Sequence, residues 1–438
     1  MNTNIDPATA LQGFATRLRA FSFLLLVLPV AVLSGCATYS ASFSRVEDDA
    51  AHRNLDSAIK SLDDLNLKGP DELLHHLNKG TLLSLQGNYA ESNRHFEEAK
   101  REMEHLRAIS VTEQAASLMV NDTLKAYEGT PAEQLFVYSY EALNYLQMGN
   151  LDDAAVEARQ FDVKQGLIAA DNKDADYLSG AFVRYLNSMV FEAQGERDDA
   201  RIEMQKAMQG YKKQDSPFPI PQGLRDDLAR IKAGRPAPSE VVMIFHNGLG
   251  ASVDENNIRV ANPSYNPNES KDLMMLSLAV PKFVRRSLPV DHVVLSAGAS
   301  SATSEVVEDV NDIAEKSFND RLPAIIARGV ARMVAKNVAA KAAKDKVGDN
   351  PLFNFVADIA TNVSERADTR SWSLLPGNIQ MARLPLAPGR YDLTATYYDP
   401  YGNVVGTHLF KGVEVRGGRK SFVMDYYFNP PAAPKAPN

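Results

Sequence analysis

The chain has 438 residues, of which 45% are hydrophobic and 23% are charged, close to the average for globular proteins. This composition excludes disorder of the whole chain, and the length suits two or three domains. The net charge of −8 argues against a nucleic-acid-binding protein, which usually carries a basic domain. The single cysteine excludes an intramolecular disulfide and a cysteine-based zinc site.

Residues 1–35 have the pattern of a secretory signal peptide. Arg17 and Arg19 precede an apolar run over 20–32, which is shorter than the ~20 residues that a membrane span needs. The run ends in the sequence LSGC, which resembles the lipobox of bacterial lipoproteins, with Cys36 as the acylated residue. The alternative is an uncleaved anchor helix that happens to contain a cysteine.

The lipobox resemblance also has implications for localisation. Ala37 after the cysteine implies sorting to the outer membrane, with the body of the protein facing the periplasm. Two or more acyl chains on Cys36 would anchor the protein to the membrane stably, whereas one chain would not. Small and polar residues prevail over 36–49, and we expect this segment to be a short tether.

Residues 50–214 predict a helical domain, because proline is nearly absent and apolar residues recur at helical spacing. Gly87, Gly149 and Gly195 each end such a helix and are expected to adopt a positive φ. Small residues stand seven positions before and five positions after each glycine, where they let two antiparallel helices approach closely: Gly80, Ser92, Ala142, Ala154, Ser188 and Ala200.

This pattern resembles the tetratricopeptide repeat, a helix pair that stacks into a solenoid. The three glycines are 62 and 46 residues apart, whereas the repeat is ~34 residues long. Lys79, Glu141 and Asn187 also replace an aliphatic residue of the repeat. We therefore expect a degenerate array of helix hairpins, and the alternative is a plain helical bundle.

In the repeat family, the first helix of each pair lines a concave surface. The resemblance therefore implies a surface that binds a protein partner and contains Phe136, Leu143, Phe182, Tyr185 and Met189. The alternative is that additional helices of the same chain cover these side chains.

Five prolines in 215–239 surround a short helix and predict a linker between domains. Beyond it, short β-rich runs and turn residues over 240–430 predict an antiparallel β-sandwich-like domain. The expected strands are 241–247, 257–261, 273–280, 292–297, 379–384, 391–398, 404–410, 411–416 and 421–428. Residues 384–405 resemble PEGA-type or carboxypeptidase-regulatory β modules, which carry no activity. A disordered tail is expected over 431–438.

A helical insertion is expected within the β domain over 305–366, with one helix at 322–346 and a second at 351–366. Arg328, Arg332 and Lys336 form a basic stripe on the first helix. Such a helix could lie on an anionic lipid surface. The alternative is a helix that packs on the sheet and turns its charged face to solvent.

The sequence shows no pattern that carries catalysis or binds a cofactor or metal. The eight histidines form no His-Glu-x-x-His motif. His75 and His76 are expected on different helix faces, and His95 and His105 are too far apart for adjacent turns, so we interpret them as structural or surface residues. A nucleophile elbow, a phosphate-binding loop and a dinucleotide fingerprint are also absent from the sequence.

Residues 127–159, 278–284 and 370–383 are similar to a group of uncharacterised bacterial lipoproteins that contain tetratricopeptide repeats. The resemblance implies localisation and architecture and supplies no catalytic residues. The anchor and the hairpin array together predict a non-enzymatic outer-membrane lipoprotein that serves as a protein-binding scaffold or adaptor in the cell envelope. The alternative is an envelope enzyme or glycan-binding module, with Trp372 or Tyr397 beside acidic groups in a cleft of the β domain.

Overall fold

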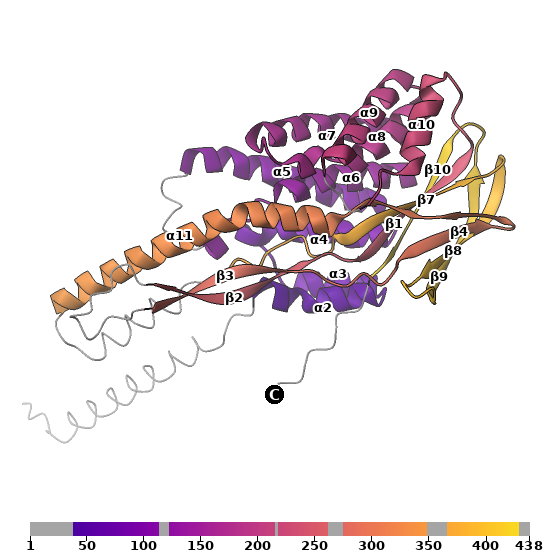
Figure 1. The fold of residues 1–438 in the computed structure, drawn as a ribbon. Helices are drawn as coiled ribbons and strands as arrows, with labels where there is room; N and C mark the ends of the chain where they lie inside the picture. Colours follow the sequence, from indigo (N-terminus) through magenta and orange to yellow (C-terminus); the bar gives the residue numbers. More distant parts are fainter. Residues whose placement is uncertain (1–37, 114–121, 215–217, 262–274, 348–365, 429–438) are drawn as a thin grey trace, which may run out of the picture.

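The computed structural model describes residues 38–113, 122–214, 218–261, 275–347 and 366–428. Helices form the N-terminal part and β-sheets the C-terminal part, which confirms the coarse prediction (Figure 1). The first part contains α2 (Tyr39–Ala51), α3 (Leu55–Asp64), α4 (Glu72–Leu85), α5 (Tyr89–Glu113), α6 (Pro131–Gln147), α7 (Leu151–Asp171), α8 (Ala181–Gln194), α9 (Arg197–Lys213) and α10 (Gln222–Lys232). The second part contains β1 (Glu240–Leu249), β2 (Ser252–Ala261), β3 (Met275–Val284), β4 (His292–Ala297), β5 (Ser300–Thr303), β6 (Glu305–Glu308), α11 (Val310–Val347), β7 (Pro376–Pro385), β8 (Gly389–Tyr398), β9 (Val404–Val415) and β10 (Lys420–Tyr427).

Three helix hairpins, α4–α5, α6–α7 and α8–α9, share one type of turn. Gly87, Gly149 and Gly195 have φ angles of 85°, 73° and 86°, as expected for glycines that end helices. The residue after each glycine donates a backbone hydrogen bond of 2.9 Å to a carbonyl five positions earlier. These acceptors are the large apolar residues Leu83, Tyr145 and Phe191. The sequence pattern thus reports a real turn geometry that closes each hairpin.

The first hairpin also shows why a small residue is needed at the crossing of the helices. A Cβ added to Gly80 would lie 2.7 Å from the ring of Phe96. The hydroxyl of Ser92 donates to the carbonyl oxygen of Gly80 at 2.6 Å. α4 and α5 therefore pack backbone against side chain at this point, and a larger residue would separate them.

One face of β1 packs on the helices and the other on a second sheet. The first sheet has the order β10-β1-β7-β6, and the second has the order β5-β4-β8-β9. Val242 and Ile244 of β1 join the core of the helices, whereas Val241, Met243 and Phe245 face the second sheet. The helices, the first sheet and the second sheet therefore form three layers, with the first sheet in the middle (Figure 1).

Several predicted strands require correction. β1 and β10 pair in parallel, so the first sheet is mixed, because β10 returns to the free edge of β1 after the whole second sheet has been built. The runs 404–410 and 411–416 form one strand, β9. β5 and β6 were not predicted, because each has only four residues.

A two-stranded sheet and a long helix form an arm beside the three layers. β2 pairs with β3 over their full length, and α11 packs on them through Leu278, Val280 and Met333. Figure 1 shows that β2, β3 and α11 run together away from the second sheet. The predicted helical insertion is corrected here, because 305–308 is a strand and the helix extends over 310–347. The helix predicted at 351–366 lies almost wholly outside the described residues.

The segment 215–239 does not separate two cores, although the sequence predicts it as a linker. α10 lies within it, and Leu224 and Ile231 belong to the same hydrophobic cluster as the helices and the first sheet. A helical array with an apolar inner face and a sheet with two apolar faces can bury all of these surfaces only against each other. The helical and β parts therefore form one packed unit.

The predicted tether over 36–49 is also corrected. α2 begins at Tyr39, and Phe43, Val46 and Ala50 are fully buried against α3 and the end of the first sheet. An apolar residue at every third or fourth position gives this segment a buried helical face, which outweighs its content of small polar residues. Among the described residues, we find no helix with the length and apolar character that a membrane crossing requires.

Candidate functional site

The inner face of the helical array is filled by the chain's own first sheet. The five residues expected to bind a partner are at most 5% exposed: Phe136, Leu143, Phe182, Tyr185 and Met189. They share one hydrophobic cluster with Val242 and Ile244 of β1 and with Ile379 and Met381 of β7. The prediction of an open binding surface at these residues is therefore wrong. Additional helices of the same chain were the expected alternative cover, whereas the cover includes a β-sheet.

Trp372 belongs to the core of the helical array, where it borders a small cavity of about 70 Å³. It is 2% exposed, and its ring lies 5.8 Å from Phe96 and 5.3 Å from Tyr140, measured between ring centres. Its indole N–H donates to the hydroxyl of Thr81 at 2.9 Å. The tryptophan therefore fastens the segment before β7 into the helices. Tyr397, at 1% exposed, is likewise a core residue between the two sheets.

A network of six charged residues, four of them buried and two partly buried, joins the helices to the first sheet. We call it the Arg383 network, and it consists of Glu192, Asp227, Arg230, Glu240, Arg383 and Lys420. Arg383 of β7 donates to Glu240 of β1 through Nη2–Oε1 and Nε–Oε2 distances of 2.6 and 3.0 Å. It also donates to the hydroxyl of Tyr185 at 2.9 Å, and Nη2 lies 3.1 Å from Oδ1 of Asp227.

The charges of this network are balanced, with three cations against three carboxylates. Burial disfavours the ionised form of Asp227, but Lys420, Arg383 and Arg230 surround it and hold its pKa below the usual range. The pKa of Arg383 is raised despite its burial, because Tyr185, Glu240 and Asp227 stabilise its charge. Each charged group of the network is thus paired with an opposite charge within the protein.

A cleft of about 660 Å³ opens beside the Arg383 network. Asp226, Arg235 and Glu305 contribute to its polar lining. The carboxylate of Glu305 is already engaged, because it accepts backbone hydrogen bonds from Gln222 and Gly223 at the start of α10. The cleft is large enough for a small polar ligand. The charged groups of the Arg383 network beside it, however, are already paired with one another and join α10 to the sheet.

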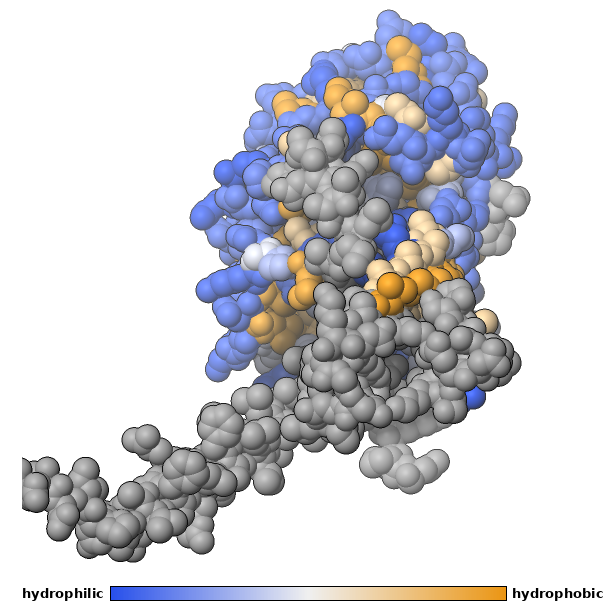
Figure 2. Space-filling model, turned by 90° about the vertical axis from the view of Figure 1, so that its left-hand side faces the viewer, coloured by the Kyte–Doolittle hydropathy of each residue, from blue (hydrophilic) through white to orange (hydrophobic). Residues whose placement is uncertain are grey.

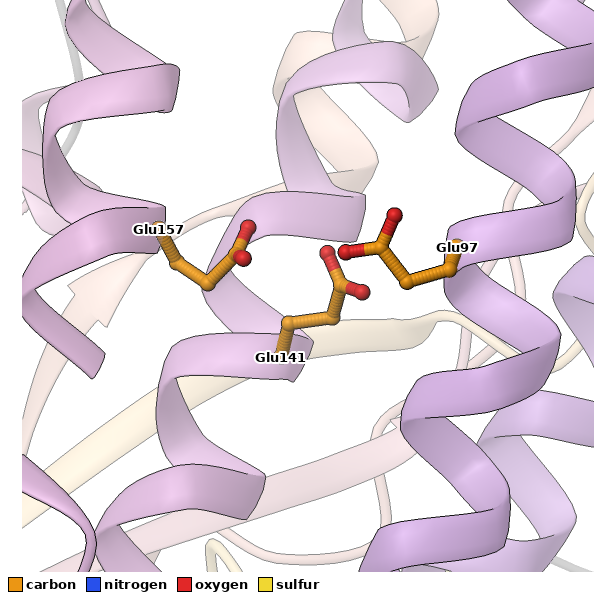
Figure 3. Close-up of side chains that lie close together, drawn as sticks. All are labelled: Glu97, Glu141 and Glu157. Atoms are coloured by element: carbon orange, nitrogen blue, oxygen red, sulfur yellow. The ribbon is translucent and has the colours of Figure 1, made fainter. Parts of the chain in front are cut away.

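Three glutamates from three helices point toward one another in the helical part (Figure 3). Glu97 lies on α5, Glu141 on α6 and Glu157 on α7, and one carboxylate oxygen of each lies within 4.8 Å of the others. Glu141 is completely buried and Glu157 is 3% exposed. By ligand type and spacing, this group could hold a divalent cation.

The ammonium group of Lys100 already supplies the positive charge at this place. Its Nζ atom lies 2.8 Å from Glu97, 2.7 Å from Glu141 and 2.9 Å from Glu157. Burial and the neighbouring charge of Glu157 raise the pKa of Glu141 to about 9, although Lys100 opposes this shift. We call these four residues the Lys100 cluster. With a proton on Glu141, Lys100 faces the two carboxylates of Glu97 and Glu157, and the Glu97 side chain is 45% exposed to solvent.

His408 and Asp425 form the arrangement nearest to a catalytic pair. Nδ1 of His408 lies 3.1 Å from Oδ2 of Asp425, which also accepts from the hydroxyl of Tyr397. Arg53 donates to Oδ1 of the same carboxylate at 3.0 Å. A hydrolase would need a nucleophilic hydroxyl at the second ring nitrogen of the histidine. Among the residues that the structure describes, none donates a hydrogen bond to that nitrogen, and the group serves to bind the loop after α2 to β10.

Three histidines that the sequence did not connect with one another lie together in the structure. His75 and His76 of α4 and His95 of α5 have ring centres within 6.0 Å of one another. The contact of Gly80 with Ser92 fixes the register of α4 against α5, and this register could have predicted the histidine cluster. In an antiparallel hairpin, four residues back on α4 correspond to about four residues forward on α5, and this register places His76 opposite His95.

The basic stripe of α11 is partly neutralised within the protein. Arg332 is buried, with its Nη2 atom 3.1 Å from Oδ2 of Asp122, and Nε of Arg328 lies 3.8 Å from Oδ1 of the same residue. The helix packs on the sheet of β2 and β3, as the alternative expected, but part of its charged face turns to Asp122 and not to solvent. Cys36 lies outside the described residues.

Comparisons with known proteins do not assign the chain to a family. No protein-family model matches it, and no curated protein matches it. Among solved structures, the S-layer protein rSbsC is similar at 10% identity and a TM-score of 0.10, over 84% of this chain and 46% of that one. The chain thus spans less than half the length of that protein, and a likeness at this level supports no conclusion about fold or function.

Proposed function

We propose that the protein is a lipoprotein of the outer membrane, anchored on the periplasmic side through acylated Cys36, and that it acts as a non-enzymatic adaptor for another envelope protein. The observation that carries this proposal is the sequence LSGC, which ends directly before α2. In this proposal, the helix hairpins are a degenerate tetratricopeptide-like array whose inner face has been taken over by the first sheet.

The position of α2 supports a close attachment to the membrane. Only residues 37 and 38 separate Cys36 from the start of α2 at Tyr39. Three Cα–Cα steps lead from Cys36 to Tyr39 and span at most about 10 Å, so the acylated cysteine would hold the start of α2 next to the lipid headgroups. Because α2 packs into the core through Phe43 and Val46, the anchor would fix the orientation of the whole body.

Because the inner face is filled, the partner would bind elsewhere, and the arm of β2, β3 and α11 is our candidate. Two large apolar side chains of the arm are exposed, Met275 at 44% and Val338 at 54%. Figure 2 shows that, on the side toward which the arm points, apolar side chains lie among a mostly hydrophilic surface. Contiguous exposed apolar patches mark surfaces that contact other proteins, and in this proposal Met275 and Val338 belong to one such patch.

The anchor can be tested by labelling cells with palmitate and separating their membranes. We expect label in the wild-type protein and none in Cys36→Ser, which should leave the membrane fraction. The matched control is Ser34→Ala, which changes a neighbouring residue and keeps the thiol. Label that remains in Cys36→Ser, or unchanged fractionation of that variant, would contradict the proposal.

The adaptor role can be tested with a photoreactive amino acid at single positions. We expect a crosslink to one envelope protein from position 338 on the arm and none from position 163 on α7, whose valine is equally accessible at 68% exposure. Val338→Glu should remove the function of the protein in cells while its fold is kept. Equal crosslinking from both positions would count against the arm as the contact.

The cleft of about 660 Å³ beside the Arg383 network favours a second candidate, a glycan-binding module or an envelope enzyme. Its polar lining of both charges fits this candidate, whereas Trp372 and Tyr397 are buried elsewhere and supply no stacking surface. The test is the turnover or binding of cell-wall material by the full chain. Turnover that is lost in Asp226→Asn would decide for this candidate.

A further inference from the structure

The three clustered histidines lie on the α4–α5 hairpin, away from the charge clusters described above. Nδ1 of His76 lies 3.0 Å from Nδ1 of His95. The ring centre of His76 lies 5.2 Å from that of His95 and 5.6 Å from that of His75, and the centres of His75 and His95 are 6.0 Å apart. All three side chains are half-buried and therefore reachable from solvent.

The distance between the Nδ1 atoms of His76 and His95 matches that between imidazoles that share one metal ion. With metal–nitrogen bonds of about 2.0–2.1 Å, two nitrogen ligands of one ion lie about 2.9–3.4 Å apart. The corresponding ring centres lie about 5 Å apart in a tetrahedral site, given the same bond length. The Nδ1 atoms of His76 and His95, 3.0 Å apart, already have the expected nitrogen–nitrogen distance. The distances from the ring centre of His75 to the other two ring centres are within 1 Å of the expected 5 Å.

The third imidazole also has a free nitrogen. Nδ1 of His75 is buried and has no hydrogen-bond partner among the described residues. Its Nε2 atom lies 3.8 Å from Oδ1 of Asp63, whose carboxylate is held by Lys79 at 2.8 Å. A carboxylate next to a metal-binding imidazole is the usual partner that fixes the orientation of the ring.

The charges around the three rings are of both signs. Burial lowers the pKa of His75 and lowers that of His95 to about 4, and the charges of neighbouring histidines and Lys79 add to both shifts. Four carboxylates act on His75 and His76, against the two cations Lys79 and Arg94. These carboxylates belong to Asp63, Glu72, Glu98 and Glu102.

We propose that His75, His76 and His95 form a binding site for one divalent transition-metal ion of the zinc(II) type, with imidazole nitrogens as its protein ligands. Imidazole ligands suit Zn²⁺, Ni²⁺ and Cu²⁺ and do not suit Mg²⁺ or Ca²⁺. The remaining coordination positions go to water. The ion would join the two helices of the first hairpin and stabilise it against unfolding. This proposal is independent of the proposed adaptor function.

The test is calorimetric titration of the full chain with ZnCl₂ near neutral pH, in a Cys36→Ser background that removes the only thiol. We expect one equivalent to bind at micromolar Zn²⁺. His76→Gln and His95→Gln should each weaken binding at least about tenfold. His105→Gln is the matched control, because this histidine lies exposed on α5, outside the cluster, and its loss should leave binding unchanged.

A second variant separates this site from the Lys100 cluster. If the bound equivalent disappears in Glu157→Gln and persists in His76→Gln, the ion belongs to the carboxylates and the proposal is wrong. Electron paramagnetic resonance of the wild-type protein with one equivalent of Cu²⁺ needs no histidine variant. We expect splitting from two or more imidazole nitrogens, and a spectrum of oxygen ligands alone would overturn the proposal.

Discussion

The Arg383 network and the Lys100 cluster contain the same types of residue but balance their charges differently. Around Arg383, three cations face three carboxylates, and the pKa of Asp227 is held low against the effect of its burial. Around Lys100, one ammonium faces three carboxylates, and the pKa of Glu141 rises to about 9 because of burial and the charge of Glu157. The first site is therefore held by ion pairs alone, whereas in the second a proton on Glu141 makes up for a missing cation.

The largest expected effect comes from removing the central cation of the balanced network. Arg383→Met leaves Glu240 and Asp227 buried without their main partner, and the loss of one partner of a buried ion pair costs about 3–5 kcal/mol. Equilibrium unfolding in urea measures this change. Arg416→Met is the control, because Arg416 and its partner Glu414 are 63% and 54% exposed and the pair contributes little. Equal losses in the two variants would show that the network contributes nothing beyond a surface pair.

Replacing one carboxylate in each site sharpens the comparison. Glu240→Gln removes an ionised partner of Arg383 and should destabilise the protein by about 2–3 kcal/mol, the range for a hydrogen bond to a charged group. Glu141→Gln reproduces the shape of a protonated carboxyl, and at pH 7 this variant should be at least as stable as the wild type. Thermal unfolding of both variants provides the measurement. A clear loss of stability in Glu141→Gln would mean that Glu141 is ionised in the folded protein.

The two sites should respond to pH in opposite directions. Because the folded pKa of Asp227 is lowered, its contribution to stability is present above its unfolded pKa of about 4 and is lost as the pH falls below that value. The folded pKa of Glu141 is raised, so its contribution is complete below its unfolded pKa of about 4.3 and is lost as the pH rises toward 9.

Two variants isolate these contributions. Glu141→Gln should gain in free energy of unfolding on the wild type as the pH rises from 5 to 9, whereas the loss in Asp227→Asn should shrink as the pH falls below 4. Urea unfolding at a series of pH values gives both curves. Parallel curves for the two variants would refute the difference in protonation.

The turns of the helical part could be predicted from the sequence because their causes are local. A glycine at a helix end and a large apolar residue four positions earlier define a hydrogen-bonded turn, as found at Gly87 with Leu83. Alternating β-rich runs likewise predicted β4 without error. These patterns depend on neighbours in the sequence and do not require knowledge of the distant chain.

The filling of the inner face could not be predicted, because it depends on partners far away in the sequence. Tyr185 has the same apolar helical spacing whether it faces a partner protein or β7, and only the structure shows its hydroxyl on Arg383. The histidine cluster was missed for a related reason, since it requires the register of one helix against another. The buried side of α2 was missed because short polar residues obscured Phe43 and Val46.

Three polar residues of the helical part replace aliphatic residues of the tetratricopeptide pattern, and their contacts explain how the fold accommodates them. Lys79, Glu141 and Asn187 stand where the repeat has an aliphatic residue, and each has found a polar contact in another element. Glu141 meets Lys100, and the amide of Asn187 donates to the carbonyl of Ala158 at 3.4 Å. Lys79 meets Asp63 of α3 at 2.8 Å.

Replacing Lys79 should have the smallest effect of the four predictions, because its ion pair reaches solvent. The side chains of Lys79 and Asp63 are 21% and 44% exposed, and exposed pairs contribute only about 0–1 kcal/mol. Lys79→Met keeps the length of the side chain and should change the free energy of unfolding by less than ~1 kcal/mol. Urea unfolding at low and high salt provides the measurement, and the small effect should shrink further at high salt. A loss as large as that in Arg383→Met would show that this pair, too, acts as a buried one.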